Sequence, residues 1–117
     1  MKKIILYGIA NCDTVKKAMV WLAKNNNTVH FHDYKKEGID KATLEAWCGM
    51  VGWQVLCNKK STTWRELPKT EQDKLTNQSA AIKIMLTHHS IIKRPVIEYK
   101  GKIMVGFNEA AYQKALK

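Results

Sequence analysis

The chain has 117 residues, of which 45% are apolar, and its formal net charge is +10. This length and composition suit one compact domain with a hydrophobic core and exclude two domains of ordinary size. No apolar stretch approaches the roughly 20 residues that a membrane-spanning helix needs, so we expect no membrane insertion.

The cysteines and the charge restrict the class of protein further. Cysteines at positions 12, 48 and 57 are an odd number without metal-type spacing, and the chain opens on a strand pattern without a basic and apolar leader. We therefore expect a cytoplasmic protein with no metal site and no tightly bound cofactor. The positive charge attracts anionic partners, but the lysines form no basic stripe interleaved with aromatic residues, so we expect no direct nucleic-acid contact.

The most informative local pattern surrounds Cys12. The apolar run 4–7 predicts a strand, and Gly8 leads into a helical pattern with Val15, Ala18, Met19 and Leu22 on one face. Cys12 would then lie in the first turn of that helix, where unpaired N–H groups and the helix dipole favour a thiolate. The alternative is a buried structural cysteine.

The role of several neighbours of Cys12 can be interpreted in two ways. Asn11, Asp13 and Thr14 are all residue types that cap helices. Lys16 and Lys17 either add positive potential near the sulfur or form a solvated face.

A second strand follows a polar break at residues 25–27. Residues 29–34 alternate between apolar and polar types, which completes a β-α-β opening. A right-handed crossover places the loop before the helix at the carboxyl edge of the sheet, where α/β proteins tend to hold their reactive groups.

The middle of the chain is predicted to be helical. A helix over 41–51 is expected to be capped by Asp40 and to bury Leu44, Trp47, Cys48 and Val51. It is followed by a short helix or extended piece at 53–57, a loop at 61–63, one turn at 64–67 and a short helix over 71–75 capped by Thr70. The last expected helix spans 78–88 and has Ile82, Met85, Leu86 and His89 on one face. Trp21, Trp47, Trp53 and Trp64 are expected to pack in the core or line a groove.

The chain closes with a hairpin and a helix. Residues 96–99 and 103–105 predict strands joined at Lys100-Gly101, and Asn108 can cap a helix over 109–116. The complete order is β-α-β, helices, then β-β-α. It predicts a single α/β domain over 1–117 with a thioredoxin-like mixed sheet and a helical insertion at about 40–90.

Three blocks of this sequence, in this order, resemble the arsenate reductase-related ArsC/Spx family, and the likeness is greatest to its small YffB-like bacterial members. The blocks are residues 7–18 around Cys12, residues 56–67, and Ile92-Lys93-Arg94-Pro95-Val96-Ile97. The resemblance implies that Cys12 and Arg94 are catalytic and that Pro95 is a cis-proline facing the cysteine. It also places Asn11, Asp13, Thr14 and Lys16 beside the bound substrate or glutathione, although Asn11 and Thr14 serve equally well as helix caps.

The chain departs from family patterns at three positions. Glutaredoxin-linked arsenate reductases have two further oxyanion-binding arginines, where this chain has Asn58 and Gly106, and losing them weakens an arsenate site. Lys59 or Arg65 could substitute, although neither is at the matching position. Spx regulators often carry a second cysteine where this chain has Val15.

These features predict a monothiol mechanism. We expect a glutathione-dependent thiol-disulfide oxidoreductase in which Cys12 attacks a disulfide substrate and glutathione, as co-substrate, resolves the mixed disulfide. Cys57 is the candidate internal resolving thiol, although we expect it to be buried. The alternatives are an Spx-like regulator that binds RNA polymerase and an arsenate reductase linked to glutaredoxin.

Overall fold

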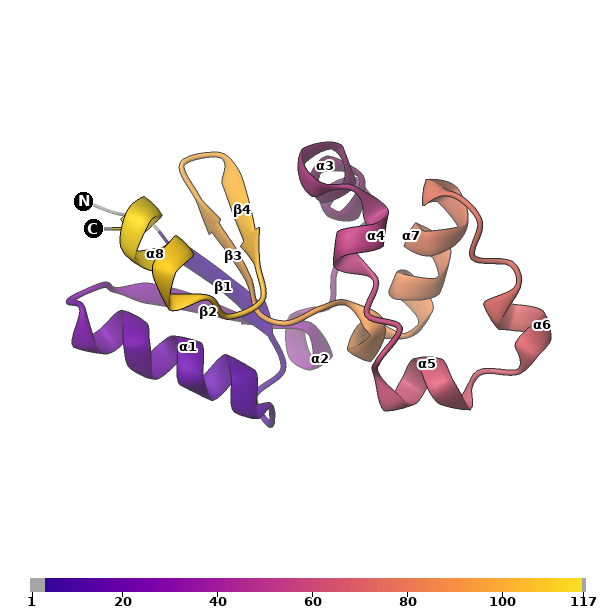
Figure 1. Ribbon diagram of the computed structural model, residues 1–117, viewed down its shortest axis with the longest axis horizontal. Coiled ribbons are helices and arrows are strands. Elements are labelled where there is room, and N and C mark those ends of the chain that lie inside the picture. The colour runs from indigo at the N-terminus through magenta and orange to yellow at the C-terminus, as the bar shows by residue number, and fades with distance from the viewer. Residues whose placement is uncertain (1–3, 117) are drawn as a thin grey trace. The chain divides into compact units, whose positions relative to one another are not determined.

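The computed structural model describes residues 4–116, which fall into two compact units (Figure 1). The first unit contains residues 4–37 and 94–116, and the second is Gly38–Lys93. Elements of the first unit are β1 (Ile4–Gly8), α1 (Asp13–Lys24), β2 (Val29–Asp33), α2 (Tyr34–Glu37), β3 (Val96–Tyr99), β4 (Lys102–Val105) and α8 (Glu109–Leu116). Elements of the second are α3 (Lys41–Val51), α4 (Trp53–Leu56), α5 (Thr62–Glu66), α6 (Lys69–Gln72), α7 (Gln78–Thr87) and the 3-10 turn η1 (His89–Ile91).

A four-stranded mixed sheet organises the first unit. The strand order is β2-β1-β3-β4, with β1 parallel to β2 and antiparallel to β3, and β3 antiparallel to β4. Tyr7 lies opposite His32 on one side and Val96 on the other. The end of β1 is therefore flanked by the end of β2 and the beginning of β3. The predicted α/β fold, with its β-α-β and β-β-α segments, is confirmed.

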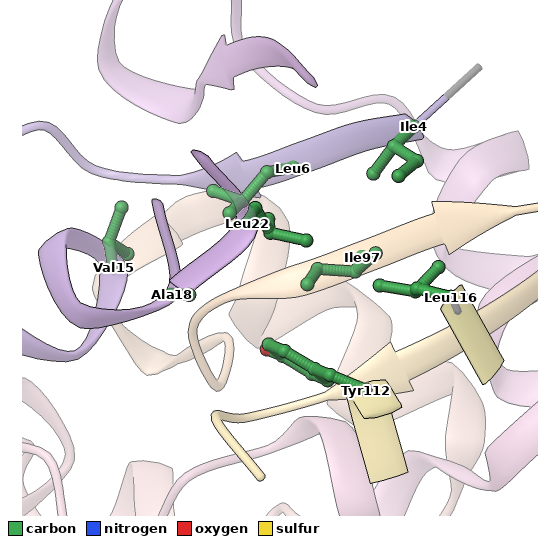
Figure 2. Packing of buried hydrophobic residues seen from close by; sticks show 8 residues of the cluster. All are labelled: Ile4, Leu6, Val15, Ala18, Leu22, Ile97, Tyr112 and Leu116. Carbon is green, nitrogen blue, oxygen red and sulfur yellow. The ribbon is translucent and has the colours of Figure 1, made fainter. Parts of the chain in front are cut away.

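Helices α1 and α8 supply the core on one face of this sheet (Figure 2). Leu6 of β1 lies opposite Ile97 of β3, and both are fully buried. The other members of the cluster are Ile4, Val15, Ala18, Leu22, Tyr112 and Leu116. The predicted buried stripe of α1 is confirmed at Val15, Ala18 and Leu22, whereas Met19 is only half-buried. Each large apolar side chain buried here contributes roughly 1.5 to 3 kcal/mol.

The predicted long helices of the second unit are confirmed. Asp40 caps α3, because its carboxylate accepts a hydrogen bond of 2.7 Å from the Thr43 N–H. Leu44, Trp47 and Cys48 are buried as expected, whereas Val51 is half-buried. Helix α7 begins after Asn77, which caps it through the Ala80 N–H, and it ends at Thr87, so that His89 belongs to η1.

Several short elements differ from the prediction. The Ser61 hydroxyl accepts a hydrogen bond of 3.1 Å from the Trp64 N–H, so α5 begins at Thr62 and the predicted loop over 61–63 is wrong. Helix α6 begins directly after Pro68, and the prediction of Thr70 as a cap is therefore also wrong. Both helices therefore begin two residues earlier than predicted, directly after Ser61 and Pro68.

Two further segments became clear only in three dimensions. Tyr34 was expected to end the second strand, but it begins the one-turn helix α2, with the Asp33 carboxylate accepting a hydrogen bond of 2.8 Å from the Lys35 N–H. Residues 53–57 divide between the two alternatives, since Trp53–Leu56 is helical and Cys57 forms an antiparallel bridge with Ile92.

The tryptophans do not share one environment. Trp47 is the one that is fully buried, whereas Trp21, Trp53 and Trp64 are half-buried. No helix within residues 4–116 is long and apolar enough to cross a membrane.

Candidate functional site: the thiol at the carboxyl edge of the sheet

Cys12 is itself the N-cap of α1. Its backbone is extended, with φ −139° and ψ 122°, and its carbonyl accepts a hydrogen bond of 3.0 Å from the Lys16 N–H. The helix has no side-chain cap hydrogen bond, so the expectation that Asn11, Asp13 or Thr14 supplies one is wrong. The thiol thus occupies the position from which a cap residue normally accepts a hydrogen bond from a first-turn N–H, where negative charge is stabilised.

A close contact between β1 and α1 fixes the approach to this thiol. A Cβ atom built on Gly8 would lie 2.7 Å from Cγ2 of Val15, a distance that real side chains essentially never adopt. Gly8 therefore permits the first turn of α1 to lie against the end of β1. Cys12, which immediately precedes that turn, is half-buried and packs against the same core.

Arg94 and Pro95 lie at the same edge of the sheet. They directly precede Val96, whose partner in the register is Tyr7 at the end of β1. The Arg94–Pro95 peptide bond is cis. The Pro95 carbonyl accepts a hydrogen bond of 2.8 Å from the Gly106 N–H, which ties the beginning of β3 to the end of β4. The antiparallel pairing of β1 and β3 thus brings residues 12 and 94 to one edge although 81 residues separate their numbers.

Three aromatic side chains, Tyr7, His32 and Tyr34, contact one another where β1 and β2 end. The rings of Tyr7 and His32 have centroids 4.7 Å apart, and those of Tyr7 and Tyr34 are stacked at 6.3 Å. Burial raises the pKa of the Tyr34 phenol, Tyr7 adds to the rise, and the positive charge of Arg94 opposes it. The Arg94 guanidinium is therefore close enough to sense Tyr34. The sequence interpretation did not assign Tyr34 to the site, although its place at the end of the second strand was the available signal.

The remaining predicted site residues lie around Cys12. Asn11, Asp13, Thr14 and Lys16 are exposed, and they occupy the loop and first turn on either side of the thiol. In the part of the chain that the structure describes, no group of three or more histidine, cysteine or acidic side chains is arranged to hold a metal ion.

Cys57 lies in the second unit and has a different environment. It is buried, and desolvation raises the pKa of its thiol, an effect that Lys59 opposes and Cys48 reinforces. Burial likewise raises the pKa of Cys48. All three cysteines are free thiols. Low exposure and a raised pKa both make Cys57 a poor nucleophile at neutral pH.

The sheet order, the cis-proline at the beginning of β3 and the thiol at the N-terminus of α1 define a thioredoxin-like α/β protein. Residues 7–115 match the model of the ArsC family. The chain belongs to the ArsC family.

Individual relatives agree with this assignment over nearly the whole chain. An uncharacterized protein of Haemophilus influenzae is 45% identical over 112 residues, which are 96% of this chain and 97% of that protein. The solved structure of a YFFB protein is 44% identical, covers 97% of this chain and 99% of its own, and superposes with a TM-score of 0.93. A solution structure of an arsenate reductase (ArsC) related protein from Brucella melitensis is also 44% identical, covers 98% and 95%, and has a TM-score of 0.76.

Proposed function

We propose that this protein is a glutathione-dependent thiol-disulfide oxidoreductase that uses Cys12 as its one nucleophile. The observation that carries the proposal is the location of a half-buried thiol at the N-terminus of α1, at the sheet edge that also holds Arg94 and cis-Pro95. Membership of the ArsC family supports an oxidoreductase.

The reaction consists of two thiol-disulfide exchanges. The Cys12 thiolate attacks the glutathione sulfur of a mixed disulfide, the S–S bond breaks, and the substrate leaves as a thiolate that takes a proton from water. A second glutathione thiolate then attacks glutathionylated Cys12, and glutathione disulfide departs. The net reaction converts the mixed disulfide and one glutathione thiol into the substrate thiol and glutathione disulfide, so one disulfide replaces another and no further oxidant or reductant is needed.

Arg94 is proposed to bind a carboxylate of glutathione. A guanidinium offers a planar pair of donors that match a carboxylate, and it stays protonated at neutral pH. The positive charge of Arg94 opposes the rise in the pKa of buried Tyr34, so the field of the guanidinium reaches the aromatic group at this edge.

The direct experiment measures glutathione disulfide formed from glutathione and its mixed disulfide with 2-mercaptoethanol. We expect Cys12→Ala to reduce turnover to the uncatalysed rate, because the other two cysteines are buried. Cys57→Ala is the matched control and retains turnover. Intact-mass analysis should show one glutathione adduct on the wild type and none on Cys12→Ala. Undiminished turnover by Cys12→Ala would refute the proposal.

The role of Arg94 has its own test. We expect Arg94→Lys to raise the KM for glutathione by roughly tenfold, because lysine keeps the charge and loses the paired donors. Arg65→Lys, an exposed arginine of α5 in the second unit, is the matched control and leaves the KM unchanged. Equal KM values for the two variants would remove Arg94 from the binding site.

Arsenate reduction is the second candidate, because a relative described as arsenate reductase-related is 44% identical to this chain. Two observations weigh against it. Asn58 and Gly106 stand where arsenate reductases have oxyanion-binding arginines. The Asn58 amide is uncharged, and its oxygen accepts a hydrogen bond of 3.0 Å from the Lys60 N–H. Gly106 has a φ of 84°, a backbone conformation that residues other than glycine adopt poorly. Gly106 thus could not become an arginine without strain. We expect no arsenate-dependent oxidation of glutathione, and appreciable turnover with arsenate would reverse this ranking.

A further inference from the structure

An apolar hollow lies one helical turn from Cys12. It has a volume of about 430 Å³ and is lined by Ala10, Val15, Lys16, Met19, Val20 and Phe31. Ala10 belongs to the loop that carries Cys12, and Lys16 donates its backbone N–H to the Cys12 carbonyl at 3.0 Å. Two of the lining residues thus belong to the loop and first turn that hold the nucleophile.

Its lining restricts the chemistry of an occupant. Lys16 is the one charged side chain, and the other five lining residues are apolar. Val20 is 54% exposed, while Met19 and Phe31 are half-buried, so the protein leaves apolar surface open to solvent at this point. Apart from Lys16 the lining offers a ligand no polar side chain, whereas an apolar group would gain by burial. The volume is within the range of about 300 to 1,000 Å³ that is typical of sites for small molecules.

We propose that this hollow selects the substrate thiol, so that the preferred substrates are mixed disulfides of glutathione with apolar thiols. The inference rests on the proposed function of Cys12. The glutathione half carries net negative charge and is attracted by Lys16 and Arg94, while the apolar half occupies the hollow. When the Cys12 sulfur bonds to the glutathione sulfur, the apolar thiolate leaves from the hollow and takes a proton from water. A second glutathione thiolate then releases glutathione disulfide and restores Cys12.

The first test compares two substrates, the mixed disulfides of glutathione with benzyl mercaptan and with 2-mercaptoethanol. We expect wild-type kcat/KM to be at least about tenfold higher for the benzyl substrate than for the hydroxyethyl substrate. The benzyl group buries more apolar surface in the hollow, and such a difference changes kcat/KM by about that factor in a hydrophobic site. Val20→Glu should lower this ratio towards unity. Any repulsion between the new carboxylate and glutathione acts on both substrates and cancels in the ratio.

Met50→Glu is the matched control, because Met50 is an exposed apolar helix residue, 45% exposed, on α3 in the second unit. It should keep the wild-type ratio. A wild-type ratio near unity, or a ratio that Val20→Glu leaves unchanged, would overturn the inference while leaving the oxidoreductase proposal intact.

A second measurement needs no turnover. S-benzylglutathione and S-methylglutathione are thioethers that cannot undergo exchange, and their binding can be followed by NMR. We expect the benzyl compound to shift the signals of Met19, Val20 and Phe31 and to bind at least about tenfold more tightly than the methyl compound. Equal affinities, or shifts elsewhere, would overturn the inference. If neither mixed disulfide is reduced but the benzyl compound binds in this way, the proposed function fails and the apolar site stands.

Discussion

At the scale of single residues, the three cysteine thiols lie in two contrasting environments. Cys12 is half-buried at a helix N-terminus, where the helix dipole stabilises negative charge. Cys48 and Cys57 are buried, and burial raises the pKa of both. The environment, not the residue type, therefore decides which sulfur can react.

This contrast predicts the order in which the cysteines are alkylated. At pH 7, iodoacetamide should label Cys12 first, and labelling of Cys48 and Cys57 should require denaturant or alkaline pH. Peptide mapping after timed quenching would give the three rates, with the urea-unfolded chain as the control in which the rates converge. Labelling of Cys57 as fast as that of Cys12 in the native protein would contradict the assignment.

Tyr112 gives a residue-scale prediction about pH. Burial raises its pKa, and its hydroxyl donates a hydrogen bond of 2.6 Å to the Gly106 carbonyl. Above about pH 10 the unfolded chain releases this proton while the folded protein retains it, so the tyrosine lowers stability by about 1.4 kcal/mol per pH unit until its folded pKa is reached.

We expect Tyr112→Phe to lower the free energy of unfolding by roughly 1 to 3 kcal/mol at pH 7, because the Gly106 carbonyl loses its donor. The deficit should shrink as the pH rises beyond about 10, since phenylalanine has no proton to release. Urea unfolding at several pH values would measure both effects. A deficit that stays constant to pH 11 would show that the Tyr112 proton is not retained in the folded state.

At the scale of elements, the contact between β1 and α1 has the most direct consequence for the site. Gly8 ends β1 and lies against Val15 in the first full turn of α1. An added methyl group must either displace that turn or distort the strand. Because Cys12 immediately precedes the turn, displacement moves the nucleophile relative to the sheet edge.

We predict that Gly8→Ala destabilises the protein by about 1 to 3 kcal/mol, the usual cost of overpacking. Gly8→Ala with Val15→Ala should be more stable than the two single changes predict together, because the second change removes the clashing Cγ2 atom. A double-mutant cycle by urea unfolding measures this coupling. Gly49→Ala on α3 is the control, since a Cβ there meets no atom within 4 Å. Strict additivity of the pair would contradict the proposed clash.

At the scale of the whole molecule, the net charge of +10 should govern encounters with substrate. A positively charged protein attracts anionic glutathione conjugates over distances of about 10 Å at 0.1 M salt and about 3 Å at 1 M salt. Attraction of this kind raises association rates without any specific contact.

The predicted result is a salt-dependent kcat/KM. Between about 0.05 M and about 1 M NaCl, kcat/KM for a glutathione mixed disulfide should fall at least roughly threefold, as screening removes the attraction. The control is the neutral disulfide of 2-mercaptoethanol, with which Cys12 forms a mixed disulfide and releases one 2-mercaptoethanol when no glutathione is present. The rate of this exchange should change little with salt. An equal response of both would show that salt acts on the fold or on the thiol itself.

The sequence by itself determined the features that depend on neighbours along the chain. The strand before Gly8, the stripe Val15, Ala18 and Leu22, and the caps Asp40 and Asn108 follow from periodicity and side-chain chemistry within a few residues. The location of Cys12 near the start of a helix is likewise determined by its neighbours along the chain. At α5 and α6 the predicted starts, residues 64 and 71, lie two residues after the observed ones, Thr62 and Lys69.

Only the tertiary structure decided what surrounds the thiol. The register of β1 against β3 brings Arg94 and cis-Pro95 to the edge that holds Cys12, and the turn after β2 adds Tyr34. The apolar hollow likewise needs Phe31 of β2 beside Val20 of α1. These neighbours are far apart in the chain, and their proximity is set by strand register and core packing, which no local pattern encodes.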